Sequence, residues 1–193
     1  AYVAALLGSG VTAFLLGRGL FGEQAGVVAA VAYVYSPYLL YTAHVRGGLP
    51  ESLALAFLPL ALWGTFHALK PDRSSRPVGF SFILIAVLAI AGFIFSHIGM
   101  ALQYLPIIGV FGLYLIWRNH RAHNALLRSH PHAHTPTLGI WKLGFGILPS
   151  IFALALGLTA FLWLPAVADL RFVQFEAAFA RAGLTYRDNF FHF

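Results

Sequence analysis

The residues best suited to chemistry lie together in one polar segment, His-Val-Arg-Gly-Gly-Leu-Pro-Glu at positions 44–51. Arg46 presents a rigid fork of donors that matches phosphate oxygens. The Gly47-Gly48 pair would let backbone amides approach a ligand closely. Glu51 falls at the predicted start of a helix, where a carboxylate suits the helix dipole. We interpret His44, Arg46 and Glu51 as the residues of a candidate functional site.

A purely structural interpretation of this segment stays open, in which Glu51 starts a helix and Arg46 anchors to lipid headgroups. A second imidazole, His97 in Phe-Ser-His-Ile-Gly at 95–99, closes a later apolar run at the same predicted membrane face. It could bind phosphate or a metal, pass a proton, or simply hydrogen-bond to a neighbouring helix. Because both segments are predicted at the same membrane face, we favour a functional site there over separate structural roles. A divalent metal in this site is possible, and we assign no metal ligand.

Composition places these residues in a membrane protein. The chain has 193 residues, of which 60% are hydrophobic and 9% are charged, against about 25% charged in an average soluble domain. Six continuous apolar runs each approach the roughly 20 residues of a membrane-spanning helix. We predict an all-α, polytopic transmembrane helix bundle of about six spans, at 1–17, 25–43, 52–69, 78–96, 100–117 and 143–166.

The net charge of +6 is not a nucleic-acid signal, because the basic residues fall in short loops between the runs. Loops of one predicted side hold eight basic residues: Arg18, Lys70, Arg73, Arg76, Arg118, Arg121, Arg128 and Lys142. Loops of the other side hold four: Arg46, Arg171, Arg181 and Arg187. The positive-inside rule makes the first side cytoplasmic. The 44–51 loop, His97 and the tail 167–193 are then extracytoplasmic.

Two further features bear on organisation. The histidine-rich segment 118–142 matches no structural-zinc spacing and the chain has no cysteine, so we interpret it as a solvated, partly disordered cytoplasmic linker. Ala1 begins inside an apolar run and Phe193 follows no closing element, which predicts that residues 1–193 are a fragment of one transmembrane domain. Helix breaks are expected at prolines, above all at Ser36-Pro37.

Several of these stretches together resemble a family of bacterial multi-spanning proteins named 6-pyruvoyl-tetrahydropterin-synthase-related membrane proteins, a name that implies no pterin chemistry here. The stretches that carry the resemblance are Tyr33–Leu40, Val45–Glu51 running into Leu58-Pro-Leu, Ser96-His97 with Ala101-Leu102 and Leu105-Pro106, Ala160–Ala166, and Phe172–Gln174. Such proteins look like membrane glycosyltransferases of the GT-C fold. The resemblance therefore implies a protein of the bacterial inner membrane.

In that class, an acidic residue of the first outer loop acts at the acceptor or a metal, and the second outer loop often carries another near the donor phosphate. If one span precedes this chain, the 44–51 segment falls in the second outer loop. The implied activity is transfer of a sugar from a polyprenyl-phosphate donor to an acceptor on the extracytoplasmic face. The resemblance implies that Glu51 is the catalytic residue, which would bind a metal or orient the acceptor. It also implies that His44, Arg46 and His97 are substrate-binding residues, with Arg46 and His44 at the donor phosphate and His97 at phosphate or metal. The first-loop acid is missing from this sequence. A non-enzymatic component of polysaccharide export or lipid transport, including lipid scrambling, is the alternative.

Overall fold

The computed structural model describes residues 1–70, 80–129 and 137–168, and the regular structure among them is entirely helical. The chain divides into two compact units, residues 1–159 and 160–193. In the first unit the helices are α1 (Tyr2–Phe21), α2 (Glu23–Val34), α3 (Pro37–His44), α4 (Leu49–Ala68), α5 (Phe80–Ser96), α6 (Ile98–Ser129) and α7 (Thr137–Leu158). The described part of the second unit holds α8 (Ala160–Ala168). The all-α prediction is confirmed.

Each of the six predicted apolar runs forms helix, with two informative breaks. The second run bends by 45° between α2 and α3, at the predicted Ser36-Pro37 position. The last run divides at Thr159, whose hydroxyl donates to the carbonyl of Ala155 at 2.9 Å. Such back-bonding by threonine commonly accompanies a bent or interrupted helix. Most of the predicted tail 167–193 lies outside the described residues, which end at Ala168.

The histidine-rich segment differs from the prediction. Arg118–Ser129 continues α6 without a break, and Thr137–Lys142 forms the start of α7. The interpretation as a partly disordered linker is therefore wrong for those residues, and residues 130–136 lie outside the described part. The helix continues because this stretch is rich in arginine, alanine and leucine, which have high helix propensity.

In the part of the chain that the structure describes, three helices are long and apolar enough to cross a membrane: α1, α4 and the Ile98–Ala125 part of α6. The bent pair α2 and α3 makes a fourth if it forms one broken span. Helix α5 and the Gly144–Leu158 part of α7 are apolar but shorter. The structure thus supports three or four spans by length and composition, and the number six stays a prediction.

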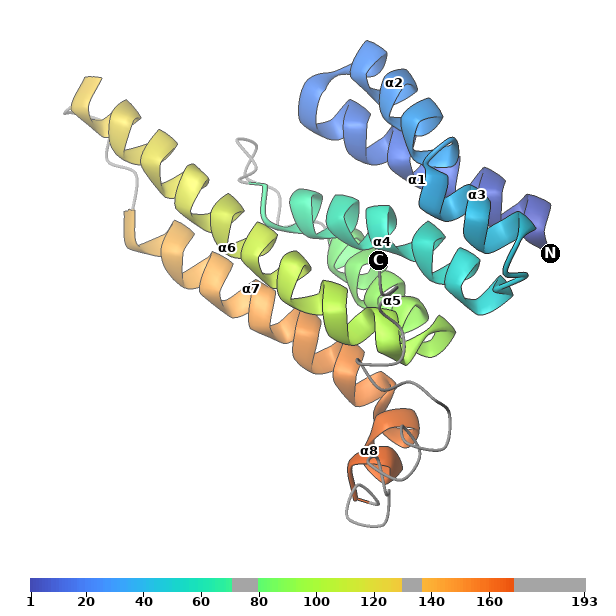
Figure 1. The fold of residues 1–193 in the computed structure, drawn as a ribbon. Coiled ribbons are helices and arrows are strands. Elements are labelled where there is room, and N and C mark those ends of the chain that lie inside the picture. Colours follow the sequence, from blue (N-terminus) through green and yellow to red (C-terminus); the bar gives the residue numbers. More distant parts are fainter. Residues whose placement is uncertain (71–79, 130–136, 169–193) are drawn as a thin grey trace, which may run out of the picture. The chain divides into compact units, whose positions relative to one another are not determined.

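Small residues allow the helices of the first unit to approach closely. Helix α1 packs against α2 and α4, and α4 packs against α5 (Figure 1). A Cβ added at Gly64 of α4 would lie 2.9 Å from the backbone nitrogen of Ala86 in α5. Glycine at this position is therefore what sets the separation of α4 and α5, as small residues commonly do between membrane helices.

We expect Gly64→Ala to destabilise the protein by about 1–3 kcal/mol, because the added methyl meets backbone that cannot turn aside. Gly8→Ala is the matched control, since its Cβ would make an ordinary 3.6 Å contact with Ala56. Thermal unfolding of the two variants in the same detergent checks this. Equal midpoints for both would show that the α4–α5 approach is not constrained by Gly64.

Candidate functional site

The 44–51 segment forms a tight turn between α3 and α4. Gly47 adopts φ +61°, a left-handed conformation that favours glycine. Its carbonyl accepts a hydrogen bond from the Tyr2 hydroxyl at the start of α1. A Cβ at Gly48 would lie 3.2 Å from the Thr42 side chain and 3.4 Å from Glu51 Oε2. The two glycines therefore let the chain reverse close to the Glu51 carboxylate.

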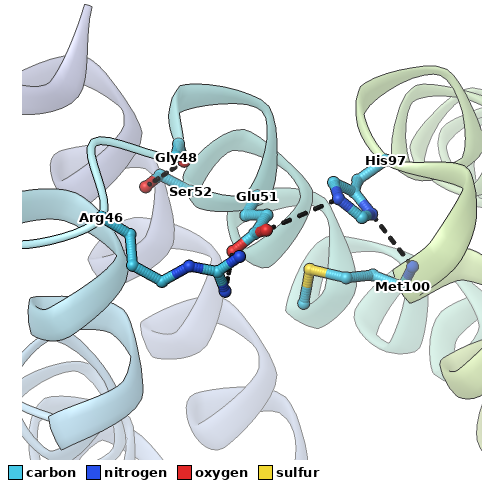
Figure 2. Close-up of polar contacts among 6 residues, drawn as sticks. All are labelled: Arg46, Gly48, Glu51, Ser52, His97 and Met100. Atoms are coloured by element: carbon cyan, nitrogen blue, oxygen red, sulfur yellow. Dashed lines mark hydrogen bonds and ion pairs between the residues drawn. The ribbon is translucent and has the colours of Figure 1, made fainter. Parts of the chain in front are cut away.

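Glu51 lies in the first turn of α4 and its side chain is only 13% exposed. A carboxylate withdrawn from water in this way needs polar partners. Its Oε2 receives Arg46 Nη1 at 3.0 Å, a charge-assisted bond within the same turn. Figure 2 shows the guanidinium reaching back beneath the first turn of α4 to this oxygen.

His97 approaches the other oxygen from a different part of the chain. It precedes α6, and its Nδ1 accepts the backbone N–H of Met100 at 3.1 Å, which caps that helix. Because Nδ1 is the acceptor, the proton of a neutral ring is assigned to Nε2. Nε2 lies 3.6 Å from Glu51 Oε1 (Figure 2). The cap thus aims the imidazole N–H at the carboxylate.

The structure brings together three of the four predicted site residues, Arg46, Glu51 and His97, which we call the Glu51 site. His44 does not join them through any described polar contact. Its Nδ1 donates to the carbonyl of Leu40 at 3.1 Å, one turn back in α3, and its side chain is exposed. Its predicted role in substrate binding stays a prediction.

Sequence analysis missed two supports of the site. Tyr2 secures the Gly47 turn across 45 residues of sequence, and no local pattern points to that pair. The capping role of His97 had a local signal, since Ser-His-Ile-Gly separates two apolar runs where a new helix must begin. A helix start with an imidazole in the capping position is a recognisable, though uncommon, arrangement.

Two properties define what this arrangement can do chemically. The Arg46 side chain is 48% exposed, and within the described residues its guanidinium bonds to Glu51, which leaves donors for a ligand. Glu51 offers a carboxylate held between a cation and an imidazole. Residues 1–70, 80–129 and 137–168 contain no group of three or more His, Cys, Asp or Glu that could hold a metal ion. Glu51 and His97 supply two potential ligands, fewer than the four of a structural zinc site.

The family described as dolichyl-phosphate-mannose-protein mannosyltransferase matches residues 1–143, about three-quarters of the chain. The chain belongs to this family. Members are membrane glycosyltransferases of the GT-C fold, which agrees with the helical architecture and with the glycosyltransferase resemblance. The match gives no support to the narrower 6-pyruvoyl-tetrahydropterin-synthase-related resemblance. Comparisons with curated proteins and with solved structures found no match.

The whole Glu51 site lies inside the matched region of this mannosyltransferase family, as does His44. Family membership supports a membrane protein that uses a lipid-linked sugar. The assignment of individual residues rests on the geometry described above.

Two variants separate the capping role of His97 from its contact with Glu51. We expect His97→Ala to cost about 1 kcal/mol of stability, because the Met100 N–H loses its acceptor. His97→Asn should keep most of that stability, since a short amide caps well but lacks an Nε2 to reach Glu51. Thermal unfolding of both variants is the measurement. A His97→Asn midpoint as low as that of His97→Ala would contradict the capping role.

Proposed function

We propose that the Glu51 site transfers a sugar from a polyprenyl-phosphate donor to an acceptor on the extracytoplasmic face of the bacterial inner membrane. The observation that carries the proposal is the convergence of Arg46, Glu51 and His97 at one end of the helices, within the region matched by the mannosyltransferase family. The first unit thereby presents a phosphate-binding cation beside a carboxylate base.

In the proposed reaction, Arg46 binds the donor phosphate. The bond between the sugar C1 and the phosphate oxygen breaks while the acceptor oxygen bonds to C1, and polyprenyl phosphate leaves. Arg46 stabilises the negative charge that develops on the departing phosphate. The proton of the acceptor hydroxyl passes to Glu51, which acts as general base. His97, through its Nε2–H, orients the Glu51 carboxylate.

The 3.0 Å pairing of Arg46 with Glu51 gives these steps an order. With no donor present the two charges neutralise each other. A donor phosphate competes for the guanidinium, and its arrival frees Glu51 Oε2 for the acceptor hydroxyl. Binding of the donor would therefore prepare the base.

Charge distribution supports the proposed sidedness. Four basic residues of the first unit lie at the ends of α1, α4 and α6 remote from the Glu51 site: Arg18, Lys70, Arg118 and Arg121. By the positive-inside rule that end is cytoplasmic, so the Glu51 site is extracytoplasmic.

An apolar groove between α6 and α7 fits the donor's isoprenoid chain. Its volume is about 510 Å³, and its lining residues all carry apolar side chains or none: Leu102, Leu105, Pro106, Gly109, Leu113, Leu148, Pro149, Phe152 and Leu156. Leu102 follows His97 by five residues, about 7.5 Å along a helix. The groove thus starts near the level of the Glu51 site and extends into the span.

Substitution at the charged pair tests the activity. In the full-length protein, we expect Glu51→Gln to lower sugar transfer by about 10²–10⁴-fold and Arg46→Ala by about 10²–10³-fold. Transfer from a labelled polyprenyl-phosphate sugar is the readout. Glu23→Gln, an exposed acid at the start of α2, is the matched control and should retain activity. Normal transfer by both site variants would refute the assignment of the activity to the Glu51 site, and an absence of transfer by the wild-type protein would favour a non-enzymatic role.

Filling the groove tests the donor site. Gly109→Leu should raise the KM for a long-chain donor about tenfold while changing kcat little, because the new side chain occupies space that the isoprenoid needs. A Cβ at Gly109 makes only a 3.8 Å contact with Phe152, so the helix should tolerate the change.

Gly146→Leu in α7 is the matched control for the groove, since a Cβ there meets nothing within 4 Å and Gly146 does not line the groove. A donor KM that rises equally in both variants would argue against the groove as the isoprenoid site.

A further inference from the structure

We propose that the end of the first unit remote from the Glu51 site binds the headgroup of an anionic phospholipid between Lys70 and Arg118. The site is independent of the proposed sugar transfer. It lies at the opposite end of α4, where the apolar span Leu49–Ala68 gives way to polar residues.

Two cations from different segments converge on a single ring. Lys70 Nζ, just beyond α4, lies 5.9 Å from the centroid of the Phe66 ring. Arg118 Cζ, on α6, lies 5.6 Å from the same centroid. Phe66 is itself only 5% exposed and packs with Leu69 and Leu115. The buried ring is therefore a fixed surface that both cations contact.

A polar link fixes the two segments relative to each other. Asn119 Nδ2, next to Arg118, donates to the carbonyl of Leu69, next to Lys70, at 2.8 Å. This bond ties α6 to the end of α4 at the level of the two cations. The convergence of Lys70 and Arg118 is thus built into the packing and does not depend only on flexible side chains.

Two like charges that contact the same ring repel each other, and an anion beside them offsets that repulsion. Within residues 1–70, 80–129 and 137–168 the acidic side chains are Glu23 and Glu51, and neither pairs with Lys70 or Arg118. The segment that follows Lys70 adds Asp72 but also Arg73 and Arg76, so its sequence adds positive charge overall. Within the described residues no carboxylate balances these two charges, which makes the pair a candidate site for an external anion.

The location identifies the source of that anion as a lipid. Lys70 comes two residues after the last residue of a candidate span, at the depth where headgroup phosphates lie. Basic residues at the ends of membrane helices bind anionic headgroups, and the cytoplasmic leaflet is the one rich in such lipids. A phosphate with a net negative charge would accept from both cations at once, which a zwitterionic headgroup does less well because its own ammonium competes.

Native mass spectrometry of the full chain, titrated with phosphatidylglycerol or phosphatidylcholine, tests the proposal. We expect wild-type protein to retain phosphatidylglycerol in preference to phosphatidylcholine. The Lys70→Gln, Arg118→Gln double variant should bind phosphatidylglycerol about thirtyfold more weakly, the loss expected for two basic residues near an anionic surface. Each single variant should show an intermediate loss, so the proposal stays testable if the double variant unfolds.

The matched control is the Arg18→Gln, Arg121→Gln double variant. It removes two charges from the same end, but Arg18 faces Phe14 and Arg121 faces Trp117 instead of the Phe66 ring. Its affinity for phosphatidylglycerol should change by less than about twofold. An equal loss in the two double variants, equal retention of the two lipids by wild type, or full competition by soluble glycerol phosphate would each overturn the proposal. Sugar transfer can fail or succeed without altering these outcomes.

Discussion

The Glu51 carboxylate is the point on which the described site depends. It lies at the start of an apolar helix, largely withdrawn from water, and such a charge is stable only when its oxygens are satisfied. Arg46 satisfies one oxygen from the adjoining turn, and His97 approaches the other from the start of α6. These two partners lie about 50 residues apart in the sequence. Because both must reach the same carboxylate, the α3–α4 turn and the α5–α6 junction lie next to each other.

Hydropathy predicted the helical class well, because apolar runs of this length in a chain with so few charges have no other stable form. The break at Ser36-Pro37 was also predictable, since proline removes a backbone donor. Hydropathy did not predict that Arg118–Ser129 is helical. The end of an apolar run marks the end of the membrane-spanning part, and a helix can continue beyond it. Helix propensity, together with the Asn119 bond to the Leu69 carbonyl, extends α6 past that boundary.

The site shows a similar division between what is local and what is not. Charge counting placed Glu51, Arg46 and His97 at one face, and the structure brings them into contact. Charge counting could not distinguish His97 from His44, because both imidazoles lie at predicted helix boundaries on that face. What separates them is direction: His44 turns back to the carbonyl of Leu40 in its own helix, whereas the cap on α6 turns His97 toward Glu51. Sequence spacing does not encode that choice.

The two ends of the first unit use charge in opposite ways. At the Glu51 site a cation and a carboxylate neutralise each other, so an incoming phosphate must displace one partner from the other. At Phe66 two cations contact one ring, and neither pairs with a carboxylate of the described residues, so the anion proposed to bind there would displace no described partner. The first arrangement suits a substrate that arrives, reacts and leaves, because part of its binding energy is used to free a base. The second suits a resident lipid that stays bound. Under the proposed function, Arg46 turns from Glu51 to the donor phosphate. The Nε2–H of His97 then still faces the Glu51 carboxylate and keeps it in position.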